Sequence, residues 1–231
     1  MTKRFQNQIA RPLAMPLIAT FLMMLLPGSA GFASTENMPA KDQFIADNQH
    51  QSLSEPPVSQ LEIDAELSVG RPFTFVWRDK NKKAIDVFGV IDVAAPRAIV
   101  WDVMIDCMQA MEIVRSLKKC MVLETAEDGS WDVRRHISKG SPLTPKVESI
   151  FRSDYDPLRS IRISRAGGDM EKQNAVWTLA TLEDGITRVT YRAASNPQYS
   201  VPNFLLKRAM RKDMPIILKN LKAASEKNLL E

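Results

Sequence analysis

The chain has 231 residues, of which 31 are Lys or Arg and 27 are Asp or Glu. Three of the basic residues and none of the acidic ones lie in the first 33 positions. The rest of the chain therefore holds 28 basic and 27 acidic residues, a net charge of +1. This near balance argues against a nucleic-acid binder, which would usually keep a stronger basic excess. Roughly 200 residues are sufficient for one domain with a hydrophobic core of its own.

Residues 1–33 have the pattern of a cleaved export signal. A basic start is followed by the apolar run 13–26, and small residues, Gly31 and Ala33, precede a cleavage position before Ser34. The apolar run is short for a membrane span. We therefore expect an exported protein, periplasmic or secreted. Retention of the segment as an N-terminal anchor is the alternative.

Cys107 and Cys120 are the two cysteines of the chain. In the oxidising compartment that an exported protein enters, such a pair tends to form a disulfide. We expect this bond, with two buried thiols as the alternative. Two sulfurs and His136 are too few ligands for a closed zinc site. We expect no metal and no cofactor.

Residues 34–60 are polar, contain three prolines and show little periodicity, which is typical of a flexible linker. The expected domain covers residues 61–231. Two short helices are predicted after its second strand. The first covers residues 96–106 and begins at Pro96, because proline is well tolerated in the first turn of a helix. The second covers residues 108–117.

Eight segments have the alternation or the β-branched and aromatic composition of strands. Asp128-Gly129 and Asp184-Gly185 are strong signals for tight hairpin turns, which favour antiparallel neighbours. The predicted strands cover residues 73–78, 85–93, 120–124, 131–137, 147–155, 160–164, 175–182 and 186–193.

Residues 202–230 are predicted to form one long amphipathic helix, which Pro215 should kink. Its apolar face comprises Leu206, Met210, Met214, Ile217, Leu221 and Ala224. Its basic face comprises Arg208, Arg211, Lys212, Lys219 and Lys222. These basic side chains suit transient contact with an anionic membrane, although a solvated face is the simpler interpretation.

Short segments in the first half of the predicted domain resemble a known superfamily. They are DVAAP at 92–96, VWDV at 100–103, Asp106-Cys107, and LKKC at 117–120. Together with the order of the elements, they resemble the START/Bet v 1-like (SRPBCC) superfamily. Within it, the chain is most similar to the polyketide cyclase/dehydrase branch that includes coenzyme Q-binding START domains. The resemblance covers about residues 85–230.

The resemblance implies an α+β helix-grip fold. In that fold a curved antiparallel sheet wraps around a long C-terminal helix, and two short helices follow the first main strand. It also implies a cavity between sheet and helix that binds a hydrophobic small molecule or lipid, with quinones and lipids as precedents. Some members are enzymes, and the fold does not fix the function.

No HExxH, GxSxG, Walker or GxGxxG motif is present, so no catalytic residue is assigned and a binding role is favoured. Arg135 is predicted to point inward, because it shares a strand face with Trp131, Val133 and Ile137. His136 is then expected on the outer surface, with a cavity base as the alternative. The candidates for the cavity wall are Trp101, Met104, Met111, Trp131, Arg135, Phe151, Trp177, Tyr191, Met210 and Met214.

Three hypotheses follow. The first is an exported START-like protein that binds a hydrophobic ligand for carriage or sequestration; it predicts an apolar cavity with few polar groups. The second is an enzyme of the cyclase/dehydrase kind, which predicts two or more titratable groups with shifted pKa values in that cavity. The third is a structural or partner-binding envelope protein, which predicts no cavity large enough for a ligand.

Overall fold

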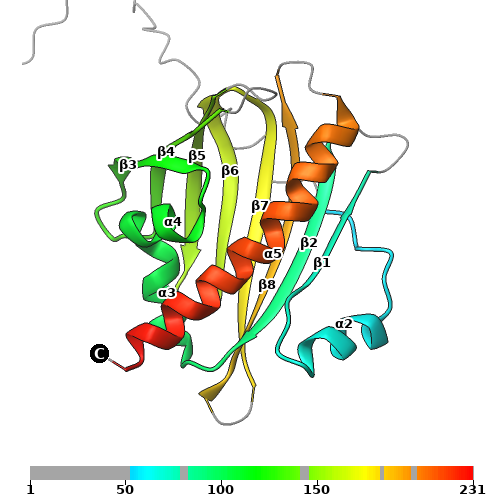
Figure 1. Cartoon of the computed structure of the whole chain (residues 1–231). Helices are drawn as coiled ribbons and strands as arrows, with labels where there is room; N and C mark the ends of the chain where they lie inside the picture. Colours follow the sequence, from blue (N-terminus) through cyan, green and yellow to red (C-terminus); the bar gives the residue numbers. More distant parts are fainter. Residues whose placement is uncertain (1–52, 79–82, 141–145, 183–184, 199–201, 231) are drawn as a thin grey trace, which may run out of the picture. The chain divides into compact units, whose positions relative to one another are not determined.

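The computed structural model describes residues 53–78, 83–140, 146–182, 185–198 and 202–230 (Figure 1). The predicted export signal and most of the predicted linker lie outside these residues. The helices are α2 (Gln60–Leu67), α3 (Arg97–Ile105), α4 (Cys107–Ile113) and α5 (Asn203–Asn228). The strands are β1 (Phe73–Trp77), β2 (Ile85–Val93), β3 (Leu117–Thr125), β4 (Trp131–Ser138), β5 (Val147–Asp156), β6 (Ser160–Gly168), β7 (Met170–Thr181) and β8 (Thr187–Pro197).

Within the described residues, the strands form one antiparallel sheet in the order β1-β2-β8-β7-β6-β5-β4-β3. Helix α5 crosses one face of this sheet, and α3 and α4 lie on the same face toward β3 (Figure 1). The predicted α+β helix-grip fold is thereby confirmed. No described helix is long and apolar enough to span a membrane.

Helix α5 lies close to β2 because β2 carries a glycine beneath it. A Cβ atom built on Gly89 would lie 3.0 Å from Leu218 Cδ1 and 3.5 Å from Met214 Cε. Leu218 is fully buried, and Met214 and Leu221 are buried with it in the main core. The apolar face predicted for this helix is therefore the face that packs on the sheet. The helix continues through Pro215.

The N-terminal part of the domain covers the opposite face of β1 and β2. Ile63 and Leu67 of α2 form a second small core with Phe88 and Val90. The helix begins at a capping box, in which Ser59 Oγ accepts from the Glu62 backbone N–H at 3.3 Å and the Glu62 carboxylate accepts from the Ser59 backbone N–H at 2.8 Å. The first described helix thus begins at Gln60, and Val58 just before it packs against the same small core.

The second short helix is shorter than predicted. It begins after Asp106, whose carboxylate accepts a hydrogen bond from the Met108 backbone N–H at 2.6 Å. It ends before Val114, where the backbone becomes extended, and β3 already starts at Leu117. The hairpin predicted at Asp128-Gly129 connects β3 and β4, and Gly129 has a φ of 70°, a conformation that glycine adopts without strain.

Candidate ligand cavity

A cavity of about 130 Å³ lies between the sheet and the helices. Its floor is formed by β4 to β7, one wall by α5, and its cover by α3 and α4. Apolar side chains dominate its lining. The lining residues are Val103, Met104, Ala110, Ile113, Val114, Arg134, His136, Phe151, Ser153, Tyr155, Ile161, Ile163, Trp177, Ile217 and Leu221.

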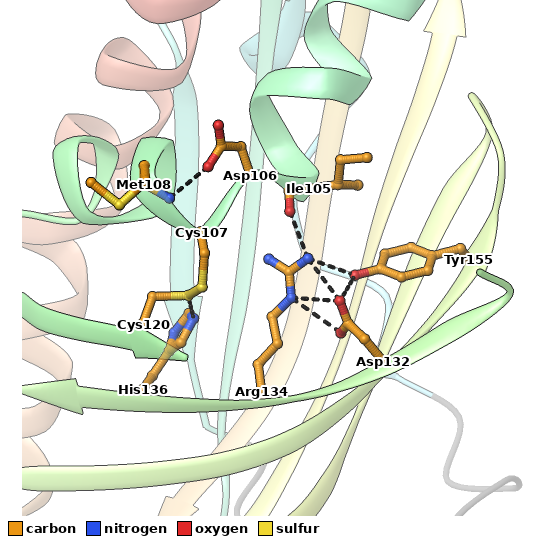
Figure 2. The surroundings of a disulfide bond; sticks show 9 residues. All are labelled: Ile105, Asp106, Cys107, Met108, Cys120, Asp132, Arg134, His136 and Tyr155. Carbon is orange, nitrogen blue, oxygen red and sulfur yellow. Dashed lines mark hydrogen bonds and ion pairs between the residues drawn. A yellow bond between two sulfur atoms is a disulfide. The ribbon is translucent and has the colours of Figure 1, made fainter. Parts of the chain in front are cut away.

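The polar part of the wall is a hydrogen-bonded cluster centred on Arg134 (Figure 2). Arg134 Nε donates to both carboxylate oxygens of Asp132, at 3.1 and 2.9 Å. Arg134 Nη2 donates to the backbone oxygen of Ile105 at 2.6 Å and to Tyr155 Oη at 2.9 Å. The Tyr155 hydroxyl in turn donates to Asp132 Oδ2 at 2.7 Å. Strands β4 and β5 and the end of α3 are thus joined at the cavity wall.

The cavity holds its titratable groups in defined protonation states. Burial lowers the pKa of His136 to about 4, and the positive charge of Arg134 acts in the same direction. Burial raises the pKa of Tyr155 to about 12, and the hydrogen bond to Asp132 contributes to this shift. Burial alone would lower the pKa of Arg134, but its bonds to Asp132 and Tyr155 reverse this and raise it. At neutral pH the imidazole is therefore uncharged, the phenol is protonated and the guanidinium is cationic.

The predicted disulfide is present next to this cluster (Figure 2). It links Cys107, the first residue of α4, to Cys120 in β3, with the two Cα atoms 5.5 Å apart. Cys120 lies directly opposite His136 in the β3–β4 ladder, and its Sγ is 3.2 Å from His136 Nε2. The bond therefore fastens the helix that covers the cavity to the strand at its rim. In the described part of the chain, no group of three or more His, Cys, Asp or Glu side chains is placed to hold a metal ion.

The structure places three of the candidate residues, Met104, Phe151 and Trp177, in the cavity wall. Others lie behind it in the core. The Tyr191 ring packs on that of Trp177, with centroids 4.2 Å apart, and the Trp101 ring meets the edge of the Tyr155 ring at 5.9 Å.

The three remaining methionine candidates lie outside the cavity lining. Met214 is buried, and Met210 is half-buried, both against the core beneath α5. Met111 is half-buried on α4.

The prediction that Trp131 and Arg135 face the cavity was wrong. Both lie on the other face of β4, where the Arg152 guanidinium stacks 4.2 Å from the Trp131 ring centre and Arg135 pairs with Glu148 at 2.6 Å. The inward face carries Asp132, Arg134 and His136 instead. Polar side chains can occupy it because they satisfy one another's hydrogen bonds.

Sequence reasoning also missed Tyr155 and Ser153. A signal for them was present, because both share a face of β5 with Phe151, which was predicted to point inward. His136 was expected on the surface, and the same choice of face explains that error.

A model of the family described as polyketide cyclase / dehydrase and lipid transport matches residues 93–222, more than half of the chain. Human STARD10 is similar in structure, with a TM-score of 0.59 and 11% identity over 80% of this chain and 78% of that one. A STAR-related lipid transfer protein from Xanthomonas axonopodis has a TM-score of 0.56 and 17% identity, over 76% of this chain and 98% of that one. The Zhui aromatase/cyclase from a Streptomyces species has a TM-score of 0.54 and 18% identity, over 62% of this chain and 94% of that one. No curated protein sequence matches the chain.

Proposed function

Because this chain belongs to the polyketide cyclase/dehydrase and lipid transport family, we propose that it binds a hydrophobic small molecule or lipid in the cavity between the sheet and α5. The fold is that of a START-like hydrophobic ligand-binding domain. Quinones, isoprenoids and lipids are the ligand classes that we propose. Carriage or sequestration of the ligand is the proposed role.

The observation that carries this proposal is the distribution of polarity around the cavity. The ionisable and hydroxyl side chains of the lining all lie on β4 and β5, whereas α3, α4, β6, β7 and α5 contribute aliphatic side chains, Met104 and the Trp177 ring. Burial of apolar surface is the main source of affinity in such sites, and a few placed polar groups orient the ligand. The cavity therefore favours a largely apolar molecule with one polar end.

The size of the cavity limits what it holds without rearrangement. Pockets for drug-sized ligands have volumes of about 300–1,000 Å³, and this cavity has about 130 Å³. An apolar cavity of roughly 150 Å³ accommodates benzene. We propose that one ring, or one end of a longer chain, enters this space. A complete lipid requires α4 or α5 to move outward, and the disulfide restrains α4.

We also propose that the protein is exported. The pattern of residues 1–33 supports export, as does the Cys107–Cys120 bond, because disulfides persist in oxidising compartments. Cell fractionation with N-terminal sequencing of the full-length product tests the proposal. A mature N-terminus at Ser34 supports cleavage, and a membrane-bound product that starts at Met1 supports an anchor. A reduced protein in the cytoplasm would refute export.

Contact of α5 with an anionic membrane is a further part of this proposal. Four side chains of the predicted basic face are exposed: Arg208, Arg211, Lys212 and Lys219. Phe204, at the start of the helix, is 69% exposed. Lys222 does not join them, because it donates to the backbone oxygen of Asp92 and pairs with Glu226, both at 2.8 Å. Sedimentation with phosphatidylglycerol vesicles but not with phosphatidylcholine vesicles is the expected result, and equal sedimentation with both refutes the contact.

An enzyme of the cyclase/dehydrase kind is the second candidate. It is favoured by the meeting of Arg134, His136 and Tyr155 at the cavity, all with shifted pKa values. However, an imidazole with a pKa of about 4 is a weak general base at neutral pH. The protonation states suit hydrogen bonding to a bound molecule better than proton transfer. Replacement of His136 by Gln abolishes activity if the imidazole is a base, whereas ligand binding persists in a pure carrier.

Mass spectrometry of organic extracts tests the binding function directly. The full-length protein is purified from its own cells without detergent, next to Ala110→Leu, which fills part of the cavity. Ala223→Leu, on the exposed side of α5, is the matched control. A stoichiometric apolar molecule in the wild type and in the control, depleted in Ala110→Leu, is the expected result. An empty wild-type protein that gains no thermal stability from lipids or quinones would refute the binding function and favour a partner-binding role.

A further inference from the structure

Among the described residues, only one side of the Arg134 guanidinium makes hydrogen bonds. The bonds to Asp132, Ile105 and Tyr155 all involve Nε and Nη2. Figure 2 shows no bond to the second terminal nitrogen, Nη1, and none is made to it by another described residue. Arg134 is one of the cavity-lining residues, and Nη1 is the terminal nitrogen of its guanidinium that no described residue bonds.

The donor is held in place before any ligand arrives. The Arg134 side chain is 8% exposed, and its partners come from its own strand, from β5 and from the end of α3. A donor that is already fixed loses little conformational entropy when it forms a bond, so it discriminates well between ligands with and without an acceptor.

The charge of this donor is already balanced. Asp132 lies against Arg134 at 2.8 Å, and its side chain is 7% exposed. His136 is uncharged at neutral pH and Tyr155 is protonated, because burial shifts their pKa values to about 4 and about 12. The other polar residue of the lining, Ser153, is neutral. An anionic ligand would therefore bring an unbalanced charge into an apolar cavity, which is strongly unfavourable.

We infer that the cavity selects an uncharged ligand group with a hydrogen-bond acceptor, such as a ketone, ester or quinone carbonyl, which binds Arg134 Nη1, and that it rejects carboxylates. This inference rests on the proposed binding function and narrows its ligand class. Neutral carbonyl compounds fit the site, whereas free fatty acids do not.

Three small probes of similar shape test the inference: styrene, benzaldehyde and benzoate. Dissociation constants are measured at pH 7 by ligand-observed NMR on the full-length protein. Because a hydrogen bond to a charged donor contributes more than one between neutral groups, benzaldehyde should bind about tenfold more tightly than styrene, and benzoate should bind most weakly. Equal binding of styrene and benzaldehyde, or tightest binding of benzoate, would overturn the inference while leaving the binding function intact. Binding of none of the three overturns the inference, and the extraction experiment above decides separately whether the binding function stands.

Two conservative variants test whether Arg134 causes the preference for benzaldehyde over styrene. Arg134→Lys keeps a cation beside Asp132 but removes the free guanidinium nitrogen, so the preference for benzaldehyde should fall to near unity. Arg135→Lys changes the neighbouring residue on the outer face and should leave the preference unchanged. An unchanged preference in Arg134→Lys overturns the assignment. If that variant does not fold, the guanidinium resonances of Arg134 in the wild type decide: they shift with benzaldehyde and not with styrene if the inference is right.

Discussion

Replacement of both Cys107 and Cys120 by Ser should lower the free energy of unfolding by about 3 kcal/mol. The disulfide closes a loop between residues 13 positions apart. In the chain-entropy model, closing a loop of that length lowers the conformational entropy of the unfolded chain by about 10 cal/mol/K. At room temperature this entropy loss corresponds to about 3 kcal/mol. For a domain of this size, each kcal/mol shifts the melting temperature by roughly 2–4 °C, so a decrease of about 6–12 °C is expected.

Circular dichroism melts of the wild type and the double variant, with and without reductant, measure this effect. The reductant should lower the melting temperature of the wild type to that of the variant, and it should not change the variant. Equal melting temperatures of the oxidised wild type and the variant would show that the loop is already restricted in the unfolded chain. The entropic account of this bond would then be wrong.

Further predictions concern packing, pH and charge. Gly89→Ala should destabilise the protein by about 1–3 kcal/mol, because the new methyl group would lie 3.0 Å from Leu218 Cδ1 of α5. In the matched variant Gly167→Ala the contact is an ordinary 3.5 Å, and a similar loss there would refute the packing argument. His136 has a folded pKa of about 4, below its value of 6.5 in the unfolded chain, so the unfolded state binds the extra proton first. The free energy of unfolding of the wild type should therefore fall between pH 6.5 and pH 4. The fall should be roughly 2–3 kcal/mol larger than in His136→Gln. Denaturant titrations measure it, and parallel pH profiles of the two proteins would contradict the prediction. Arg134→Gln leaves a buried carboxylate unpaired and should cost about 3–5 kcal/mol. Arg135→Gln is the control, because Arg135 and Glu148 form a pair that is about one-third exposed, and it should leave the urea midpoint nearly unchanged. Similar losses of stability in the two variants would show that burial does not determine how much an ion pair contributes.

The order of elements could be predicted because each carries a local signal. The apolar stripe of α5 and the turn at Gly129 depend on residues that are neighbours in the sequence. The resemblance to START domains then supplied the arrangement that local signals cannot specify. The ends of strands were less predictable: β6 and β7 extend to Gly168 and Met170, where the strands pair beyond the apolar segments that identified them. Where such a strand ends depends on hydrogen bonds to its neighbouring strands, and these bonds leave no pattern in the local sequence.

The inward face of β4 could not be read from its own sequence, because its apolar residues, Trp131, Val133 and Ile137, lie on the face that turns away from the cavity. The decision comes from the neighbouring strand: Arg134 is the cross-strand partner of Phe151, and partners in a ladder share a face. That register depends on the connection between β4 and β5, which has no tight-turn signal. A one-residue change in register exchanges the two faces completely.

The same strand links the fold to the proposed function. A buried ion pair contributes little net stability, because the cost of removing two charges from water offsets their attraction. Asp132 and Arg134 nevertheless lie side by side, Arg134 lines a mainly apolar cavity, and β5 supplies Tyr155 to complete their hydrogen bonds. Replacing a buried ion pair by apolar side chains of similar volume is often neutral or stabilising. The cluster is therefore better explained by the oriented, charge-balanced donor that it presents to a ligand than by any contribution to folding.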